Sequence, residues 1–359
     1  MVSSLEDRAE NLMIRIDGSE KSGSGTILRY AMALASLLGE ELEMTNIRAR
    51  RKKPGLRPQH LKSVIACCEI TGGTIEGAVV DSTRIRYRPG AGSKKTHYFW
   101  DIGTAGSTTM LAFNILPLAI FSPKSLQLRI SGGLFQDFAP GAYHMHGVLL
   151  PLLARMGVRS TLNVMRPGYV PKGGGVLEME SHPMDGKLSP LILTEQGRVK
   201  SVRGVSLASH LRQQHVAKRM AQRCKTILSN RGLRAKFEIV EDTSALQRGA
   251  ALFISAETDR GCLMGADQAG QVGRPSEAIG AFVAKSLLED LDAGATVDRH
   301  LADQLILFAG LADGTTTYLI PRLTEHVETN LWLIEMILGA KTSLEGNQVK
   351  IEGVGFERK

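Results

Sequence analysis

The chain has 359 residues and a formal net charge of +8, from 44 Lys and Arg against 36 Asp and Glu. Its 43% of hydrophobic and 22% of charged residues are typical of a globular protein and exclude a disordered tail, a collagen and a coiled coil. Because no stretch of about 18 uncharged apolar residues is present, we expect no membrane-spanning helix and no membrane partner.

Strands, helices and glycine-rich turns alternate from the start of the chain. The first strand is predicted at 13–16 and the first helix at 27–38, where a glycine follows as a typical helix end. A strand at 41–47 and a helix at 61–70 come next, followed by a hairpin from 74 to 87. This order of elements predicts an α/β fold.

The same order of elements returns twice later in the chain. Helices predicted at 146–156 and 331–338 each end at a glycine, and two strands follow each of them. The third unit comes about 90 residues later than the first two would place it, which indicates an insertion. The fold class is therefore predicted as α/β, with three repeated βα units and a small inserted α/β domain. We place the core at 1–184 and 273–359 and the inserted domain at 185–272.

Two segments carry many basic residues and no acidic ones. Seven Lys or Arg lie between 44 and 63, and eleven lie between 198 and 237, inside the predicted insertion. Such segments attract phosphates, so two of them favour a nucleotide or nucleic-acid ligand over a merely solvated surface. The insertion is also expected to form its own strands and helix, at 199–207, 213–229, 235–241 and 251–257.

Three short segments are candidates for phosphate binding. Segments 17–26 and 102–109 are turns of small residues before predicted helices, where backbone N–H groups and the helix N-terminus favour an anion. Segment 48–51 holds three arginines at a strand end, and arginine binds phosphate through two N–H groups at once. Capped turns and an exposed basic loop, with no ligand, are the alternative interpretation of these segments.

The last predicted helix carries a candidate nucleophile. Its apolar stripe consists of Val327, Leu331, Ile334 and Leu338. His326 lies off this stripe, in the first turn of the helix if Thr324 is the N-cap residue. A helix N-terminus disfavours imidazolium, so it would keep the ring neutral and nucleophilic and would stabilise a phosphate bound to it. From its position alone, a surface histidine is the simpler interpretation.

Together these motifs resemble the RNA 3′-terminal phosphate cyclase family, from about residue 14 to residue 351. The matching segments follow the family's order and spacing. They are Ile27-Leu-Arg29, Arg48-Ala-Arg-Arg51-Lys-Lys53-Pro-Gly55, Gln59-His60-Leu, Gly103-Thr-Ala-Gly-Ser107, Ser131-Gly-Gly133, Ala139-Pro140, Gly173-Gly-Gly175, Leu301-Ala-Asp-Gln304 and His326-Val-Glu-Thr-Asn330. The resemblance implies three repeats like the C-terminal domain of translation initiation factor 3, with a small inserted domain.

The resemblance also implies a reaction. His326 would attack the α-phosphate of ATP to form a histidine–AMP intermediate, and the AMP would then pass to an RNA 3′-terminal phosphate. The vicinal 2′-hydroxyl would close a 2′,3′-cyclic phosphate and release AMP, a step favoured by proximity. The implied cofactors are ATP and Mg²⁺ or Mn²⁺, and the implied partner is an RNA 3′-end.

By the same resemblance, His326 is the catalytic residue. The residues implied to contact ATP are Pro140, His300, Asp303, Gln304, Thr329 and Asn330. Those implied to bind phosphate or RNA are Arg29, Arg48, Arg51, Gln59 and Ser107. Pro140 would pack against adenine, and His300 stands where the family often has a tyrosine that stacks on adenine.

The chain departs from the family in its first loop. Ser22 stands at the position of a glutamate that helps to hold the metal, and Thr26 at that of a glutamine, so the metal ligands are unknown. Loss of the glutamate favours one alternative, a non-catalytic cyclase-like RNA-binding protein in RNA processing, whereas His326 favours the enzyme. A second alternative is a transferase of the enolpyruvyl type, which would need the arginines but no histidine in this motif.

Cysteine usage bears on the cellular compartment. The four cysteines, Cys67, Cys68, Cys224 and Cys262, show no C-x-x-C spacing. They argue against a disulfide scaffold and a zinc ribbon, and they predict a cytoplasmic location. The oligomeric state is left open, with a homodimer as one alternative.

Overall fold

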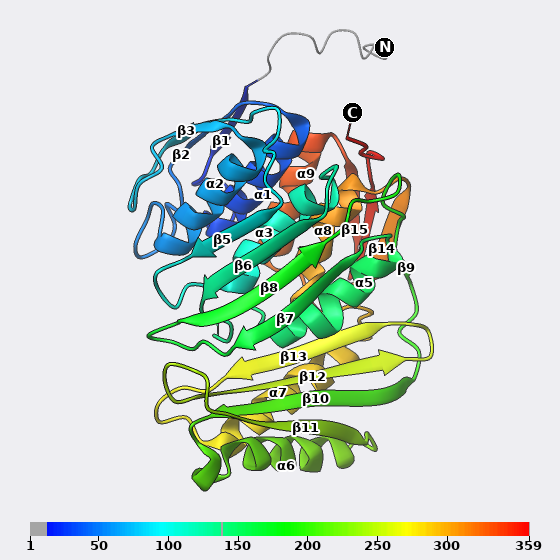
Figure 1. Ribbon diagram of the computed structural model, residues 1–359. Helices are drawn as coiled ribbons and strands as arrows, with labels where there is room; N and C mark the ends of the chain where they lie inside the picture. Colours follow the sequence, from blue (N-terminus) through cyan, green and yellow to red (C-terminus); the bar gives the residue numbers. More distant parts are fainter. Residues whose placement is uncertain (1–12, 138, 359) are drawn as a thin grey trace.

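The computed structural model describes residues 13–137 and 139–358. Within these residues the strands form four sheets of four strands each, and helices pack against them (Figure 1). In every one of these sheets a parallel pair of strands lies at one end and two antiparallel pairings follow. The protein is therefore of mixed α/β class, as its sequence predicts.

The first sheet contains the first predicted strands and the hairpin. Its strands are β1 (Ile14–Asp17), β2 (Leu42–Thr45), β3 (Thr74–Glu76) and β4 (Ile85–Arg88), in the order β1-β2-β4-β3. Helices α1 (Gly25–Leu38) and α2 (Pro58–Thr71) connect the first three strands. Each helix ends at a glycine in the left-handed region, Gly39 with φ 71° and Gly72 with φ 65°, which spares the strain that a Cβ would bring there.

The second sheet has the same order of pairings. Its strands are β5 (His97–Asp101), β6 (Leu126–Gly132), β7 (Ser160–Arg166) and β8 (Gly175–Ser181), in the order β5-β6-β8-β7. Helix α3 (Thr108–Ile120) connects β5 to β6 and is buried along nearly its whole length. The helix predicted at 146–156 starts earlier, as α4 (Ala142–His144), and continues through a π-helical turn (Met145–Leu149) into α5 (Leu150–Arg155).

The third sheet is assembled from distant parts of the chain. Its strands are β9 (Ile192–Leu193), β14 (Thr315–Leu319), β15 (Lys341–Glu345) and β16 (Gln348–Glu352), in the order β9-β14-β16-β15. Helix α8 (Leu301–Leu311) precedes β14, and α9 (Glu325–Leu338) connects β14 to β15. Strands β9 and β14 are parallel neighbours although more than a hundred residues separate them, so the intervening chain leaves the sheet and returns to it.

The fourth sheet lies in that intervening chain. Its strands are β10 (Val199–Ser209), β11 (Ala235–Asp242), β12 (Gly249–Thr258) and β13 (Leu263–Ala269), in the order β11-β10-β12-β13. A 3₁₀ turn (Arg212–Gln214) leads into α6 (Val216–Ser229), and α7 (Ser276–Asp292) follows the sheet and packs on α6, β12 and β13. Helix α7 lies beyond residue 272, where we place the end of the insertion; the domain boundaries stay a prediction.

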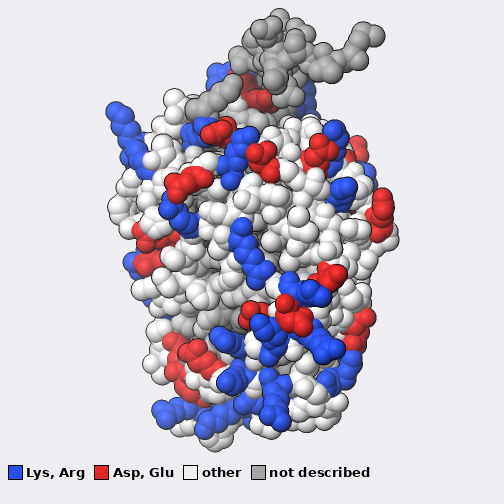
Figure 2. All heavy atoms as spheres, turned by 90° about the vertical axis from the view of Figure 1, so that its right-hand side faces the viewer, with Lys and Arg blue, Asp and Glu red and all other residues white. Residues whose placement is uncertain are grey.

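The second basic segment of the sequence, 198–237, lies at this fourth sheet, in β10, α6 and β11. Lys and Arg side chains crowd the lower part of the face in Figure 2, the level at which Figure 1 shows β10–β13 with α6 and α7. Above it, α1 packs against α2, α3 and α9, and α8 packs against α9, so these helices share one apolar core. No helix in the described part of the chain is long and apolar enough to cross a membrane.

Candidate active site

His326 lies in the first turn of α9, as predicted. The Thr324 hydroxyl accepts a hydrogen bond from the Val327 N–H at 3.2 Å and caps the helix. The predicted apolar stripe of this helix is buried, whereas His326 is half-buried. Burial, followed by the charges of Arg51 and Arg29, lowers the pKa of His326. The imidazole is thus neutral at neutral pH, and the structure attributes this to burial and arginines, where the sequence suggested the helix end.

Three of the predicted phosphate-binding arginines lie close to one another. Burial, and then the charges of Arg48 and Arg51, lower the pKa of the Arg29 guanidinium to about 10, while the Asp303 carboxylate opposes the shift. Burial and the neighbouring Asp298 raise the pKa of Asp303 to about 7, so this carboxyl is only partly ionised at neutral pH and compensates only part of the positive charge. Clustered guanidinium groups beside a neutral histidine form a site that favours an anion.

Arg48 also holds its own loop together. Its Nη1 donates hydrogen bonds to the carbonyl oxygens of Lys53 at 2.9 Å and Gly55 at 2.7 Å. Its backbone has a φ of 57°, in the left-handed region that is uncommon for residues other than glycine. The backbone of this loop and the Arg48 side chain are therefore fixed by internal contacts before any ligand arrives.

His60 is a residue at this site to which the sequence assigns no role. It is buried, and burial together with the charges of Arg29 and Arg48 holds its pKa well below the usual value. An ideal Cβ at Gly25 would lie 2.3 Å from Nε2 of His60, so only glycine fits at the start of α1. The one available signal is its place within the Gln59-His60-Leu segment of the family resemblance.

Thr329 and Asn330 connect three elements of the site. The first-loop residue Ser22 donates its N–H to the Thr329 hydroxyl at 3.2 Å, and the Thr26 hydroxyl donates to Oδ1 of Asn330 at 3.0 Å. Asn330 Nδ2 in turn donates to the carbonyl oxygen of Asp303 at 3.1 Å. Both side chains are buried and hold the first loop and α8 against α9; their contact with ATP stays a prediction.

A second chain of hydrogen bonds joins α2, α3 and the segment before α4. The Ser107 N–H donates to Oε1 of Gln59 at 2.8 Å, and the Ser107 hydroxyl caps α3. That hydroxyl lies 2.8 Å from the hydroxyl of Thr109, which donates to the carbonyl oxygen of Pro140 at 2.7 Å. The structure thus connects Gln59, Ser107 and Pro140, although they lie on separate elements.

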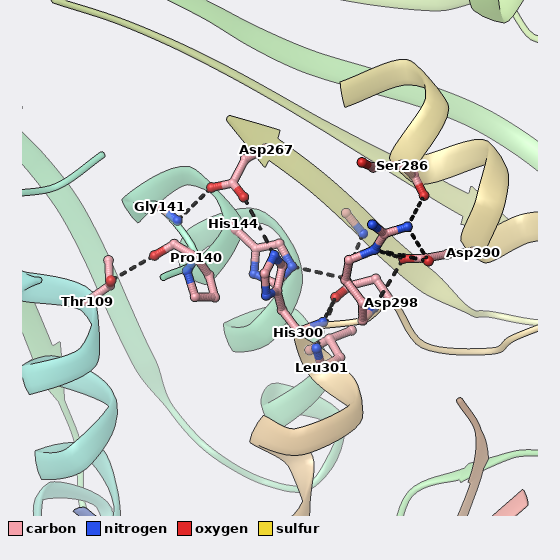
Figure 3. A network of polar contacts seen from close by, with 12 residues as sticks. Thr109, Pro140, Gly141, His144, Asp267, Ser286, Asp290, Asp298, His300 and Leu301 are labelled. Atoms are coloured by element: carbon pink, nitrogen blue, oxygen red, sulfur yellow. Dashed lines mark hydrogen bonds and ion pairs between the residues drawn. The ribbon is translucent and has the colours of Figure 1, made fainter. Parts of the chain in front are cut away.

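His300 lies in a buried network between the core and β13 (Figure 3). Its ring is 5.4 Å from that of His144, which pairs at 3.0 Å with the fully buried Asp298. Asp298 also accepts the N–H groups of His300 and, from the fourth sheet, Gly265, both at 2.8 Å. Asp267 of β13 accepts the Gly141 N–H at 2.6 Å. Carboxylates from the segment before α8 and from β13 therefore fix the surroundings of His300.

The described residues do not form a protein-only metal site. Among 13–137 and 139–358, no three His, Cys, Asp or Glu side chains are grouped as metal ligands. The buried residues of the first loop are small and hydroxylic, Ser22, Ser24 and Thr26 among them. Mg²⁺ is often held by substrate phosphates with few protein ligands, so we assign no reaction step and no ligand residue to a metal.

A nucleophilic nitrogen held among guanidinium groups is typical of enzymes that transfer phosphorus groups. The family described as RNA 3′-terminal phosphate cyclase matches residues 20–344. The RNA 3′-terminal phosphate cyclase of Pyrobaculum neutrophilum is 36% identical over 96% of this chain and 100% of its own length. That of Korarchaeum cryptofilum is 38% identical, over 96% and 99%. The chain therefore belongs to the RNA 3′-terminal phosphate cyclase family of enzymes.

One solved structure is also similar. It is the enolpyruvyl transferase NikO from Streptomyces tendae. The aligned region covers 96% of this chain and 52% of the NikO chain, with 14% sequence identity. Its TM-score is 0.27, which is too low to carry an argument about fold or activity.

Proposed function

We propose that the protein converts an RNA 3′-terminal phosphate into a 2′,3′-cyclic phosphate with ATP, through a covalent intermediate between His326 and AMP. The observation that carries the proposal is the neutral, half-buried His326 within reach of the charges of Arg29 and Arg51. A neutral imidazole has a free electron pair for attack, and guanidinium groups stabilise the charge that develops on a phosphorus centre.

In the first step, a ring nitrogen of His326 attacks the α-phosphorus of ATP. A nitrogen–phosphorus bond forms, the bond from the α-phosphorus to the bridging oxygen breaks, and diphosphate leaves with the electron pair. Arg29, Arg48 and Arg51 stabilise the negative charge of the nucleotide during this step. The positive charge of the substituted imidazole makes it a good leaving group for the next transfer.

In the second step, an oxygen of the RNA 3′-phosphate attacks the phosphorus of the AMP, and the nitrogen–phosphorus bond breaks to restore His326. In the third, the 2′-oxygen attacks the activated 3′-phosphorus and loses its proton, while AMP leaves. The 2′-hydroxyl is already tethered next to the phosphorus, so ring closure gains from proximity. AMP supplies the leaving group that a phosphate monoester lacks.

We assign roles to the remaining predicted residues from their places in the fold. Pro140 and His300 flank the adenine, with Asp303 and Gln304 nearby at the start of α8. Thr329 and Asn330 hold the nucleotide region in place through the first loop, and Gln59 with Ser107 orients the loop before α3. Mg²⁺ or Mn²⁺ would accompany the ATP and neutralise part of its phosphate charge, and the RNA 3′-end is the partner substrate.

The architecture that suits this function is three βα repeats like the C-terminal domain of translation initiation factor 3, interrupted once. The first three sheets support it, because each orders its strands along the chain as first, second, fourth and third. The fourth sheet lies between the first and second strands of the third unit. A cytoplasmic location, and a homodimer as one alternative for the assembly, complete the proposal.

The deciding experiment is a label transfer from ATP. Purified protein is incubated with ATP labelled at the α-phosphate and with Mg²⁺ or Mn²⁺, and label on the protein is measured. We expect label on the wild-type protein and none on His326→Ala, whose binding of RNA and circular dichroism spectrum should be unchanged. His182→Ala, which removes a more exposed histidine, is the matched control and should be labelled normally.

The same experiment separates the enzyme from its main alternative. Wild-type protein that is folded and binds RNA, but takes up no label with either metal, would contradict the proposed reaction. The non-catalytic RNA-binding relative would then be the better interpretation, with Ser22 in the first loop as the reason. If the protein is labelled but converts no RNA 3′-phosphate, the result would support the histidine–AMP step and contradict the proposed RNA substrate.

A further inference from the structure

The turn between β7 and β8 contacts the loop between β11 and β12, so the second and fourth sheets are joined at this point. The Gln247 side chain makes the contact: Nε2 donates to the carbonyl oxygen of Val170 at 2.7 Å, and Oε1 accepts the N–H of Lys172 at 3.0 Å. An ideal Cβ at Gly249 would lie 2.2 Å from the ring of Tyr169, so only glycine permits this close approach. Figure 1 shows the two connections at the same side of the molecule.

This contact adjoins the turn before α3, which the sequence identifies as a candidate phosphate site. An ideal Cβ at Gly173 would lie 2.9 Å from Cα of Ala105, so the two backbones touch. Two residues further along, a span of at most about 7 Å, the Ser107 N–H donates to Gln59. Gln59 precedes His60, whose pKa the arginines of the site lower. The β7–β8 turn is therefore close enough to contact a strand whose end lies at these arginines.

Three exposed cations surround the contact, and none of them has an acidic partner among the described residues. Lys172 lies in the β7–β8 turn, Arg248 in the β11–β12 loop, and Arg212 in the 3₁₀ turn after β10. His210, just before that turn, donates from Nε2 to the carbonyl oxygen of Ala245 at 2.7 Å. The third segment is thereby held against the second, and the three cations lie on adjoining loops.

The charges nearby indicate that these cations are not used within the fold. The three segments that carry them, here called the loop junction, contain no Asp or Glu. They are 167–175, 210–215 and 243–248. Asp242, just before the last segment, accepts hydrogen bonds from the Ser244 hydroxyl at 2.6 Å and from two backbone N–H groups. By contrast, Arg219 of α6 has a carboxylate partner in Glu277 of α7. The cations of the loop junction are left for an anion from outside.

Exposed apolar side chains lie beside these cations. Val170 is 56% exposed and Leu246 is 54% exposed. An ideal Cβ at Gly174 would lie 2.3 Å from Cδ1 of Leu246, so this leucine packs across the β7–β8 turn. A single RNA strand presents phosphates together with the flat faces of unstacked bases. Cations beside apolar side chains on fixed loops suit such a strand better than a purely ionic partner.

We propose that the loop junction binds the backbone of single-stranded RNA directly upstream of the 3′-terminal phosphate, with Lys172, Arg248 and Arg212 contacting phosphodiester groups. The inference rests on the proposed function, since that function puts the 3′-terminal phosphate at the arginines beside His326. Phosphate contacts position a strand without reading its sequence. The junction therefore adds affinity for any RNA 3′-end and takes no part in the transfer from ATP to His326.

The test measures, by fluorescence anisotropy at several salt concentrations, the binding of an RNA strand of about 12 nucleotides that ends in a 3′-phosphate. The junction variant carries Lys172→Gln, Arg248→Gln and Arg212→Gln and should bind at least about tenfold more weakly than wild-type protein. The slope of log affinity against log salt should become shallower by about 2, because each phosphate contact to a single strand contributes about 0.7. RNA that ends in a 3′-hydroxyl should show the same loss, because the junction contacts the backbone.

A matched control removes three exposed cations elsewhere. Lys94 and Lys95 precede β5, whereas the turn at the junction follows it, and Lys350 lies on β16. The variant with Lys94→Gln, Lys95→Gln and Lys350→Gln loses the same charge, but distant charges are screened, so it should bind RNA within about twofold of wild-type protein. Equal losses in both variants would mean that net charge alone attracts RNA. That result, or an unchanged affinity in the junction variant, would overturn the assignment.

Two further measurements separate the remaining outcomes. If polyglutamate displaces the bound RNA as well as unlabelled RNA does, the junction accepts any polyanion and the assignment to RNA is overturned. Label transfer from ATP is measured without RNA, and the junction variant should be labelled at the wild-type rate. RNA binding that depends on the junction, without any labelling, would support the junction and contradict the histidine step. Labelling together with RNA binding that does not depend on the junction would do the reverse.

Discussion

At the scale of single residues, the titration of His326 depends on its arginine neighbours. Only the neutral ring can attack ATP, so labelling falls as the pH drops through the pKa of His326. Burial and then Arg51 lower that pKa, and Arg51 is exposed, so it can be replaced without disturbing the core. We expect Arg51→Gln to raise the pKa and to move the acid limb of the labelling profile to higher pH.

The same substitution should also slow labelling by about 10- to 100-fold, because a group that stabilises the transition state is lost. The measurement is kcat/KM for label transfer as a function of pH, which reports the pKa of the free protein. Lys218→Gln, at an exposed position of α6, removes a charge from the fourth sheet's helices and should change neither rate nor midpoint. If Arg51→Gln is labelled more slowly but the acid limb of its pH profile is not shifted, Arg51 acts on the nucleotide and not on the pKa of His326.

At the scale of elements, the cap of α9 positions the nucleophile. Thr324→Ala removes the hydroxyl that accepts the Val327 N–H and should lower the free energy of unfolding by about 1 kcal/mol. The first turn, which carries His326, then frays, so labelling should slow by several-fold. Urea unfolding and label transfer measure the two effects. Thr324→Ser keeps the cap and should restore both; if it behaves like alanine, the methyl group, and not the cap, matters.

Elements with a local signal could be predicted from the sequence. Helix α1 ends at Gly39 and α9 begins after Thr324, as predicted, because a left-handed glycine and a hydroxyl cap act within a few residues. The helices α7 and α8 have no counterpart among the predicted elements. Nearly every residue of α8 is buried, so it lacks the alternation of polar and apolar faces by which an amphipathic helix is recognised.

The residues of the candidate site also differ in whether the sequence alone identifies them. His326 and Arg51 could be identified because each belongs to a short motif that resembles a family. The surroundings of His60 and of Asp267 are set by contacts across the fold, with Gly25 in one case and with Gly141 and His300 in the other. The spacing of residues in the sequence does not predict such contacts, because the partners come together only when the sheets pack.

At the scale of the whole molecule, one buried carboxylate joins the fourth sheet to the core. Asp298 pairs with His144 on α4, accepts the Gly265 N–H from β13, and caps the turn before α8 through His300 and Leu301. Each of these donors would be left without its partner if the carboxylate were lost. The position of β13, and with it that of Asp267, therefore depends on Asp298.

Replacement of this carboxylate tests how tightly the two parts are joined. Asp298→Asn should lower the free energy of unfolding by about 3 kcal/mol, the cost of breaking a buried ion pair, whereas Glu352→Gln in the exposed pair with Lys341 should cost less than about 0.5 kcal/mol.

Burial alone would lower the pKa of His144, but Asp298 raises it above the usual value. The ionic part of the stabilisation is thus complete below about pH 6.5 and is lost as the pH rises through that raised pKa. The wild-type advantage over Asp298→Asn in urea unfolding should therefore be larger at pH 6 than at pH 9; an advantage that is the same at both pH values would show that His144 is neutral in the pair.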